Sequence, residues 1–557
     1  MSKIKVVTIA LLALSQSAFA AELLLPGAGG QIQQIPPAPI PQRVFPEIQT
    51  EQGSVPVTPD SSEIRILVKV LQVAGQTRYS EAELVAVTGF IPGEDLTLSE
   101  LRVMAAKITD HYHRNGYFLA QAYLPAQDIQ DGAVTIVVLE GQYGNVTLHN
   151  QTNLSDRLAN GLFDAPEEGS VIAIAPLESR LLLLSDIPGV NVNSTLVPGA
   201  SVGTSDLIVD LTPGQRVTGS IEADNAGNYY TGRYRLGATV NLNNPTGHGD
   251  VLSLRALTSG SGMNYGRASY QIQLGKATAG VAYAVMEYEL GKEFASLDAH
   301  GTAQIASVFG RYPLIRSRST NLYALLQYDD KIFRDKVDVT STVNEKKVRV
   351  GMGGLAGNHR DGFAGGGLTS YSFTGTVGNV DIITPEALAV DEATAQTNGS
   401  FQKLGFNAAR LQRVSERVSL YAALNGQIAW QNLDISEKMA LGGPYSVRAY
   451  PVGEGYSDEG YVATLEARLR LPKFSERQPG QMYLIGFADT GRGTINEDPW
   501  TDEENHRTLS GAGIGFTWVD YNNFMVNMSY AFKLGNEDAT AAPDASGQFW
   551  IQLVKYF

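Results

Sequence analysis

The sequence predicts a transmembrane β-barrel of about sixteen antiparallel strands, preceded by two small α+β domains. Three observations support this fold class. From Val217 to Phe557, apolar and polar residues alternate with a period of two in one segment after another. Between Ile64 and Leu211, a β-α-α-β-β order of elements occurs twice. The last segment, Gly547 to Phe557, reads as an aromatic strand that ends on a phenylalanine.

The N-terminal region predicts export from the cytoplasm. Two lysines precede an apolar run, and Ala18-Phe19-Ala20 has the small residues of a cleavage site, so residues 1–20 read as a signal peptide. Residues 21–62 are rich in proline and glutamine and read as a linker, with one short helix near Gly27 to Ile35. After the signal, no apolar run of about 18 residues occurs, which excludes a transmembrane helix but not a transmembrane barrel.

The composition limits the possible functions. The 557 residues include no cysteine and carry a formal net charge of −15. An exported chain without cysteine must be stable without disulfides, which is common in the bacterial envelope. The acidic balance argues against a nucleic-acid partner.

Two domains of similar organisation are predicted at 63–143 and 144–215. In the first, the strands are expected at Ile64 to Val73, Tyr117 to Leu124 and Ala133 to Leu139, and the helices at Ser80 to Val87 and Leu98 to His113. In the second, strands are expected at Gly144 to His149, Val190 to Val197 and Leu207 to Leu211, and helices at Leu154 to Leu162 and Pro176 to Leu184. The repeated order resembles POTRA domains, periplasmic modules that bind extended polypeptide by adding a strand to a sheet edge.

The region 216–557 is predicted to be the barrel. Within Tyr461 to Leu471 every second residue is apolar, and from position 464 on the residues between them are Thr464, Glu466, Arg468 and Arg470. In a soluble sandwich the apolar face would need a second layer, and no helix intervenes to provide one. A closed barrel in lipid explains the pattern, because closure satisfies every backbone group and the polar face lines the lumen.

One long loop interrupts the alternation. Leu441 to Gly460 reads LGGPYSVRAYPVGEGYSDEG, which is too rich in glycine and proline for a strand or a helix. Loops of this length are usually functional or disordered. We expect the segment 431–460 to fold into the barrel between strands 11 and 12, with Arg448 near its tip. Asp489, in the run Gly486 to Gly491 at the end of strand 13, is expected to point into the lumen, where it could hold an arginine in a bidentate pair.

These two runs resemble a known signature. LGG…SVRAYP…G together with GFADTG is similar to the motifs of two-partner secretion transporters of the haemolysin secretion/activation family, which also have POTRA domains. These outer-membrane pores belong to the polypeptide-transporting β-barrel superfamily, as does the barrel-assembly insertase. In the family, the sixth extracellular loop folds back into the barrel, and the arginine of its VRGY motif meets the aspartate of the strand-13 motif.

The resemblance implies a role for each matching residue. Val447, Arg448, Ala449 and Tyr450 would form the loop tip, Asp489 would be the lock partner, and Gly486, Phe487 and Gly491 would complete the strand-13 motif. Ala449 stands where many members have glycine, which adds a methyl group and restricts φ at the turn. Phe557 would be the signal by which the barrel-assembly machinery recognises the last strand. Some members carry a helix that plugs the pore, which the short helix in the linker could provide.

The function implied is export of an unfolded partner exoprotein across the outer membrane without ATP, with the POTRA domains in the periplasm. The cargo could be a haemolysin, an adhesin, a toxin or a haem-binding protein, and the barrel would also contact lipid and lipopolysaccharide. The alternatives are a barrel-insertion factor of the same superfamily and a passive porin or adhesin barrel. No cofactor, metal or enzymatic activity is expected, although barrel hydrolases exist.

Other candidate sites have weaker patterns. His111 and His113 are two residues apart on a helix, so they point to different faces and are unsuited to share a metal ion. The acidic runs Asp329-Asp330 and Asp502 to Glu504 are expected in exposed loops, where they could contact calcium or lipopolysaccharide.

Overall fold

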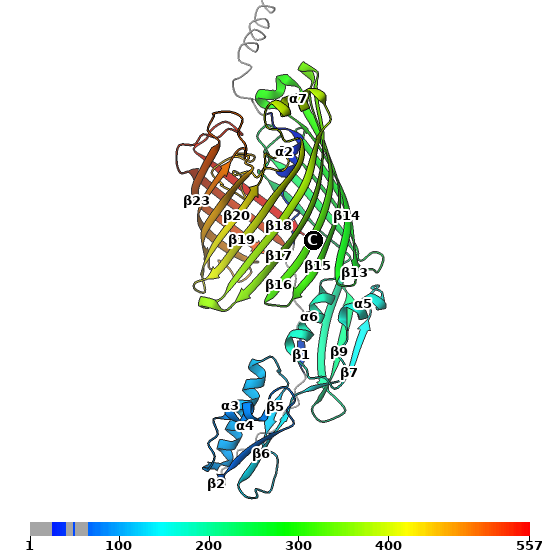
Figure 1. Ribbon diagram of the computed structural model, residues 1–557, viewed down its shortest axis with the longest axis vertical. Helices are drawn as coiled ribbons and strands as arrows, with labels where there is room; N and C mark the ends of the chain where they lie inside the picture. Colours follow the sequence, from blue (N-terminus) through cyan, green and yellow to red (C-terminus); the bar gives the residue numbers. More distant parts are fainter. Residues whose placement is uncertain (1–24, 41–47, 51–64) are drawn as a thin grey trace, which may run out of the picture.

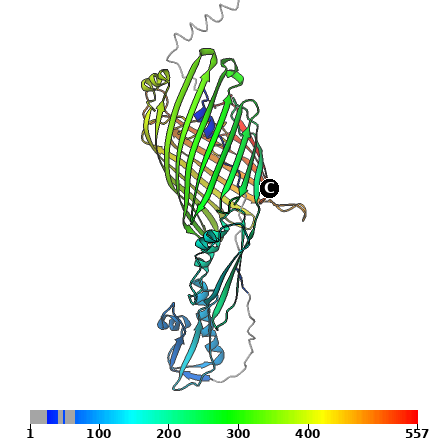
Figure 2. The same ribbon diagram turned by 90° about the vertical axis from the view of Figure 1, so that its right-hand side faces the viewer.

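The computed structural model describes residues 25–40, 48–50 and 65–557. A tall barrel stands above two small domains that follow one another below it (Figures 1 and 2). The predicted signal peptide, most of the linker and Ile64 lie outside the described residues. No helix among the described residues is long and apolar enough to cross a membrane.

The barrel is closed by sixteen antiparallel strands, which confirms the predicted fold class. In chain order these strands are β10 Val217–Asp224, β11 Arg235–Asn243, β12 Val251–Thr258, β13 Met263–Leu274, β14 Ala277–Glu289, β15 Ala299–Arg316, β16 Thr320–Val337, β17 Thr342–Asp361, β18 Gly367–Ile382, β19 Gly399–Arg413, β20 Val418–Ala429, β21 Glu459–Arg470, β22 Gln481–Thr494, β23 His506–Asp520, β24 Phe524–Lys533 and β25 Gly547–Tyr556. Each pairs with its neighbour in sequence, and β10 pairs with β25 from Ser220 opposite Tyr556 to Asp224 opposite Gln552. Because the sheet closes on itself, no barrel strand has an edge whose backbone N–H and C=O groups would lack hydrogen-bond partners in lipid.

The two faces of the wall differ in chemistry. Leu465 and Ile514 are 63% and 65% exposed on the outside, whereas Asp489, on the inward face, is 3% exposed. The acidic pair at 329–330 was expected in a loop, and this expectation is wrong. Both residues lie within β16, where Asp329 is buried and Asp330 is an exposed neighbour of Arg349 on β17.

The first small domain has helices α3 Glu81–Thr88 and α4 Leu98–Arg114 on strands β2 Arg65–Val68, β3 Val70–Ala74, β4 Glu94–Thr97, β5 Gln121–Tyr123 and β6 Ala133–Leu139. Thr97 and Glu100 form a capping box that starts α4. The single strand expected over 64–73 is two strands, because β2 pairs with β4 whereas β3 pairs with β6. The strand expected over 117–124 shortens to β5, because Tyr117 and Ala120 still form turns at the end of α4.

The second small domain repeats the plan with β7 Gln142–Asn150, α5 Asp156–Phe163, α6 Ile174–Ser185, β8 Val190–Pro198 and β9 Thr204–Pro213. Its sheet has the order β1-β8-β9-β7, and β1 is the linker segment Ile48–Thr50. This segment runs parallel to β8, with Ile48 opposite Ser194. The linker therefore supplies the outer strand of this sheet, which the sequence did not predict.

The second domain is tied to the turns at the lower end of the barrel. Arg316, at the end of β15, donates from Nε and Nη2 to the two carboxylate oxygens of Asp186 at 2.7 and 2.9 Å. Arg318 lies 2.9 Å from Glu178 of α6. Ser155 also donates its backbone N–H to the carbonyl of Gly247, between β11 and β12. These contacts hold the domain below β11, β12, β15 and β16.

The short helix α2, Ala28–Gln33, lies inside the barrel. Its first backbone N–H donates to Oδ1 of Asp335 on β16 at 2.8 Å. Beyond its end, Arg235 and Arg255 donate to the carbonyls of Gln34 and Pro36. A Cβ at Gly29 would lie 3.0 Å from that of Ser436, so glycine allows the helix to approach the long loop closely. Residues 28–36 of the linker thus lie in the lumen, whereas Ile48–Thr50 belong to the sheet of the second domain.

Candidate functional site

The site is the tip of the loop that joins β20 to β21. Residues 430–458 have no helix or strand and fold back into the lumen. Leu441, Val447, Ala449 and Tyr450 are fully buried at the tip and pack with residues of β21, β22, β23 and β24. Because the tip is held by an apolar cluster as well as by polar contacts, it has one fixed position against the wall.

Arg448 is bound by carboxylates on two neighbouring strands. Its Nε and Nη2 donate to the two oxygens of Asp489 on β22, both at 2.8 Å, and its Nη1 donates to Oε1 of Glu466 on β21 at 2.8 Å. The side chain of Asp489 is fully buried, and that of Arg448 is 12% exposed. This bidentate pairing fixes the direction of the guanidinium as well as its charge.

Further contacts complete the site. The guanidinium carbon of Arg448 lies 3.5 Å from the centre of the Phe487 ring, a cation–π arrangement. Thr464 donates to Asp489 at 2.9 Å, and the Trp550 indole donates to the carbonyl of Arg448 at 2.7 Å. Arg468 donates to the second oxygen of Glu466 at 2.8 Å. Two arginines and two carboxylates therefore alternate, so no charge in this group lacks a partner.

The remaining predicted residues have different surroundings. Gly491 leaves room for Val447, whose Cγ2 would lie 3.2 Å from a Cβ at that position. Gly486 faces open space, and its run lies within β22, which continues to Thr494 and does not end at Gly491 as expected. Phe557 lies at the seam between β10 and β25, where its backbone pairs with that of Gly219. The structure thus brings Val447, Arg448, Ala449, Tyr450, Phe487, Asp489 and Gly491 together, and leaves Gly486 and Phe557 apart.

Ala449 fits its turn without backbone strain. Its φ is not in the positive range that would favour glycine, and its methyl group packs over Gly511 of β23. A Cβ at Gly511 would lie 2.4 Å from the Cβ of Ala449, so the small residue on the strand makes room for the alanine on the loop. The position where many relatives have glycine therefore keeps a buried, well-packed residue here.

The sequence alone did not identify Glu466, Thr464 and Trp550 as neighbours of Arg448. Thr464 is paired with Asp489 across β21 and β22, and Glu466 is paired with Phe487. The alternation placed Thr464 and Glu466 on the lumen face, but only the register between strands shows which of them meets the loop. Trp550 comes from β25, about one hundred residues further along the chain, and no local pattern connects it to Arg448.

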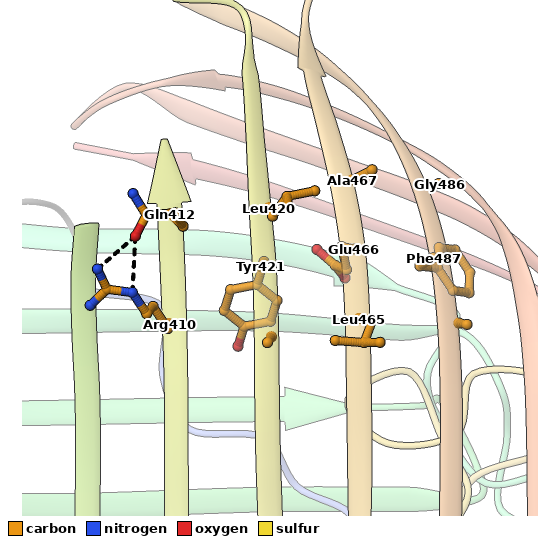
Figure 3. A pocket seen from close by; sticks show the side chains of 11 residues that line it. Arg410, Gln412, Leu420, Tyr421, Leu465, Glu466, Ala467, Gly486 and Phe487 are labelled. Atoms are coloured by element: carbon orange, nitrogen blue, oxygen red, sulfur yellow. Dashed lines mark hydrogen bonds between the residues drawn. The ribbon is translucent and has the colours of Figure 1, made fainter. Parts of the chain in front are cut away.

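A cavity of about 540 Å³ lies beside the Arg448 contacts, along β19 to β22 (Figure 3). Tyr421, Glu466 and Phe487 line it, and Arg410 and Gln412 are hydrogen-bonded to each other at one side. Arg468 lies over the ring of Tyr421, 4.5 Å from its centre. The wall next to the loop tip thus presents aromatic and aliphatic surface to the lumen, with arginines that are paired with Asp361 and Glu466.

One group of the described residues has the spacing of metal ligands. Asp298, His300 and Asp338 offer three ligand atoms within 4.8 Å of one another. Asp298 and Asp338 lie in the connections that follow β14 and β16, and His300 is the second residue of β15. They are exposed or half-exposed, and acidic groups of this kind are common without an ion. His111 and His113 have separate surroundings, since His111 lies beside Tyr79 whereas His113 contacts the carbonyl of Ala120.

Comparison with known proteins places this geometry in context. Residues 203–518, more than half of the chain, match the family model "Haemolysin secretion/activation protein ShlB/FhaC/HecB", and residues 66–141 match "POTRA domain, ShlB-type". The heme/hemopexin transporter protein HuxB of Haemophilus influenzae is 29% identical over 474 residues, which cover 84% of this chain and 82% of that protein. The outer membrane transporter CdiB of Dickeya dadantii is 23% identical, with 75% and 74% of the two chains covered.

Solved structures share the fold. CdiB from Escherichia coli superposes with a TM-score of 0.66 at 21% identity, covering 90% of this chain and 93% of that one. BamA from Haemophilus ducreyi, lacking its POTRA domains 1–3, gives a TM-score of 0.52 at 15% identity, with coverage of 88% and 100%. Both likenesses extend over the barrel and beyond it.

Proposed function

This chain belongs to the haemolysin secretion/activation family, and from that membership we propose that Arg448 and Asp489 form the lock that holds loop 430–458 inside an export pore. The protein is an outer-membrane β-barrel transporter that exports a partner exoprotein by two-partner secretion, with its POTRA modules in the periplasm. What remains to be assigned is how its own residues capture the cargo, keep the pore closed and hold the loop.

The observation that carries the lock proposal is the three-way binding of one guanidinium. Arg448 reaches Asp489 with two nitrogens and Glu466 with a third, while its backbone N–H and carbonyl also have partners at Asp489 and Trp550. Removing one member of such a buried pair typically costs about 3–5 kcal/mol, because the other charge is left uncompensated. The barrel strands are held by their own hydrogen bonds, so we expect the lost free energy to destabilise the position of the loop and not the barrel.

The lock is tested by Arg448→Ala and Asp489→Ala, with secretion of the exoprotein as the readout. We expect secretion to fall sharply while the barrel stays folded in the outer membrane and heat-modifiable on gels. The matched control is Arg470→Ala, which removes an exposed arginine from β21 and should leave secretion unchanged. Partial rescue by Arg448→Asp with Asp489→Arg would support direct pairing. Full secretion by either alanine variant, at normal barrel levels, would exclude the lock.

Helix α2 is proposed to act together with the loop as a plug. Gly30 accepts a hydrogen bond from the Tyr456 hydroxyl at 2.9 Å, and Gln33 donates to the carbonyl of Ile435 at 2.9 Å. A polypeptide entering from the modules therefore meets the helix and the loop as one obstacle. Deleting residues 25–36 should raise the ion conductance of the purified protein in planar bilayers, and an unchanged conductance would contradict this assignment.

Cargo capture is assigned to the first module. β5 is at one edge of the sheet order β3-β6-β5, next to α4, and Tyr123 on it is 44% exposed. An extended peptide can add to an edge of this kind through backbone hydrogen bonds. A photo-crosslinking residue at position 123 should capture an N-terminal fragment of the exoprotein, whereas the same residue at Val202, which is 88% exposed in the second module, should not. Equal capture at both positions would place the binding surface elsewhere.

The energy for export is proposed to come from folding of the cargo outside the cell, since the sequence has no nucleotide-binding motif. The cargo itself is proposed to be of the haem-binding class, on the basis of the 29% identity to the heme/hemopexin transporter protein over most of both chains. Co-expression with the exoprotein of the neighbouring gene, followed by a haem-binding assay on the secreted product, tests this. A secreted product that lyses cells without binding haem would favour the haemolysin class.

Assembly is proposed to depend on Phe557. Its ring lies against Gly219 at the seam, where a Cβ on that glycine would be 2.6 Å from the ring. Removal of Phe557 should lower the amount of heat-modifiable barrel without changing secretion per folded molecule, whereas normal amounts would show that the barrel-assembly machinery reads another feature.

A further inference from the structure

Loop 430–458 is also fixed at a second place, on β16, β17 and β19 of the wall. Lys331 of β16 lies 2.7 Å from Oε1 of Glu437, and Lys403 of β19 lies 3.0 Å from its Oε2. Lys346 of β17 donates to Oδ2 of Asp434. We call Lys331, Lys346, Lys403, Asp434 and Glu437 the lysine clasp. All five side chains are 16% exposed or less.

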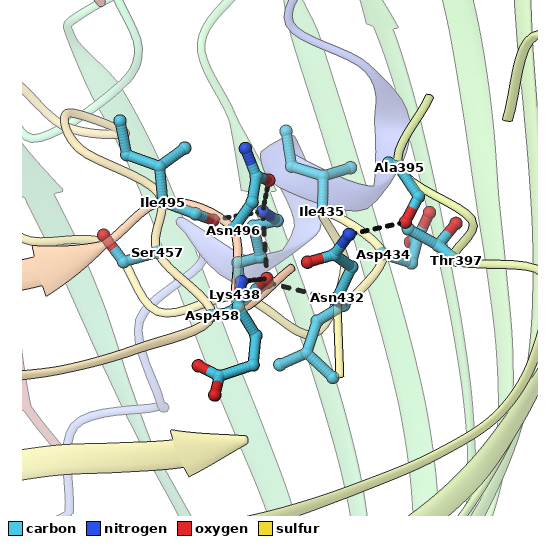
Figure 4. A network of polar contacts seen from close by, with 12 residues as sticks. Ala395, Thr397, Asn432, Asp434, Ile435, Lys438, Ser457, Asp458, Ile495 and Asn496 are labelled. Carbon is cyan, nitrogen blue, oxygen red and sulfur yellow. Dashed lines mark hydrogen bonds and ion pairs between the residues drawn. The ribbon is translucent and has the colours of Figure 1, made fainter. Parts of the chain in front are cut away.

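The clasp also supports helix α2. Asp335, four residues after Lys331 on β16, accepts from the backbone N–H of Ala28 and from the Tyr288 hydroxyl. Between the two clasp carboxylates, Ile435 accepts from Gln33, the last residue of α2. Figure 4 shows Asn432, Asp434 and Ile435 beside the ribbon of this helix. Opening the clasp would therefore free one side of the obstacle in the lumen.

The two fixed ends of the loop differ in chemistry. At the lock, one planar guanidinium binds two carboxylates in defined directions and stacks on Phe487. At the clasp, each ammonium is a compact charge on a flexible stem, and ammonium groups are strongly hydrated. Burying such charges costs several kcal/mol of solvation free energy per ion, which is recovered when water reaches them again. Hydration of the released charges therefore offsets part of the free-energy cost of opening the clasp.

We propose that the lysine clasp is the releasing end of the loop: it opens when cargo enters the lumen, while the Arg448 end stays bound. This inference rests on the proposed export function and assigns its moving part. The loop contacts β16, β17 and β19 at the clasp and β21, β22 and β25 at its tip, and the residues after α2 reach Arg235 of β11 and Arg255 of β12. Together they cross the lumen and obstruct a polypeptide while both places are held. Release at the clasp clears the side of the lumen where α2 lies and leaves the tip on its apolar cluster.

Neutral variants of nearly the same shape test the clasp in the closed state. Asp434→Asn with Glu437→Gln keeps the side-chain volumes but removes both charges that hold the lysines. We expect the conductance of the purified protein in planar bilayers to rise severalfold, with heat-modifiability unchanged. The matched control is Asp330→Asn with Arg349→Met, an exposed pair 3.9 Å apart on the same two strands as Lys331 and Lys346. Conductance no higher than in this control would overturn the proposal.

A crosslink tests release itself. The protein has no cysteine, so Lys403→Cys with Glu437→Cys introduces the only two thiols of the chain. Without crosslinker we expect this variant to secrete the exoprotein. With a short bismaleimide added to cells, the crosslinked fraction should stop exporting, whereas the parent chain treated in the same way should continue. Undiminished export by fully crosslinked protein would show that the clasp need not open.

The outcome is separable from that of the lock. If Arg448→Ala secretes normally but the crosslink blocks export, the lock assignment fails and the clasp stands. If Arg448→Ala loses secretion and the crosslinked clasp still exports, the clasp fails and the lock stands.

Discussion

The periplasmic modules and the barrel lumen differ in how many charged side chains they bury. Both have apolar clusters, the lumen around α2 and the loop tip, but buried charges are concentrated in the lumen. The first module packs Leu84, Leu101 and Ile108 around its sheet, and the second packs a similar apolar core. The lumen instead buries charged side chains, among them Glu222, Asp224, Arg235 and Arg255. A small module depends strongly on its apolar core for stability, whereas the barrel is held by its closed hydrogen-bonded wall. Lumen side chains can therefore serve function without carrying the fold.

The largest effect is expected from a cavity in a module core. Phe163, at the end of α5, is 1% exposed, and its truncation in Phe163→Ala should destabilise the second module by about 3–5 kcal/mol. Amide hydrogen exchange should accelerate over residues 142–213 while the barrel stays heat-modifiable. The control Leu465→Ala removes an apolar side chain that is 63% exposed on the lipid face and should leave exchange in the module unchanged. Equal amide protection over residues 142–213 in Phe163→Ala and Leu465→Ala would show that the module does not depend on its apolar core.

A second test uses a charge that is buried in a module. Glu140 is 4% exposed and accepts from the backbone N–H groups of Thr77 and Arg78 at 2.7 and 2.9 Å and from the Tyr112 hydroxyl at 2.7 Å. In Glu140→Gln one acceptor oxygen becomes a donor, so a loss of about 1.5–3 kcal/mol is expected. Exchange over 65–141 measures it, and Glu83→Gln, at an exposed carboxylate, is the control. No difference between the two variants would show that the network carries no stability.

Acid should weaken the same network by a smaller amount. Burial raises the pKa of Glu140, but the hydrogen bonds from Thr77, Tyr112 and Arg78 together lower it by more than burial raises it. The pKa of Glu140 therefore lies below its ordinary value. A lowered folded-state pKa means that this stability is fully present above the unfolded value, about 4.3, and is lost as the pH falls through the folded value. Exchange in the first module should therefore accelerate below about pH 4.3, and in Glu140→Gln this part of the pH dependence should disappear.

The contrast between the regions also decides what the sequence could predict. Apolar periodicity and helix caps are local features, so the sequence could predict both modules and the sixteen strands. Arg448 and Asp489 could be paired because a motif marks each of them. The clasp could not, since Lys331 and Glu437 are separated by about one hundred residues and neither is in a motif. The same limit hid β1, because three linker residues become a strand only when β8 is beside them.

The smallest effect is expected where the loop tip touches the wall. In Gly511→Ala the new Cβ would lie 2.4 Å from the Cβ of Ala449 and 3.2 Å from the carbonyl oxygen of Phe532, so the tip must shift, at a cost of about 1 kcal/mol. Ala449→Gly alone removes one buried methyl group and should change secretion little. Together the two substitutions should recover much of the loss, because the nearest remaining loop atom, the Cα of residue 449, is at an ordinary 3.5 Å. Secretion per folded barrel, measured for both single variants and the double variant, gives the coupling directly. Additive losses would mean that the tip does not rest on Gly511, whereas recovery would show that the alanine at this position and the glycine facing it act as one packed pair.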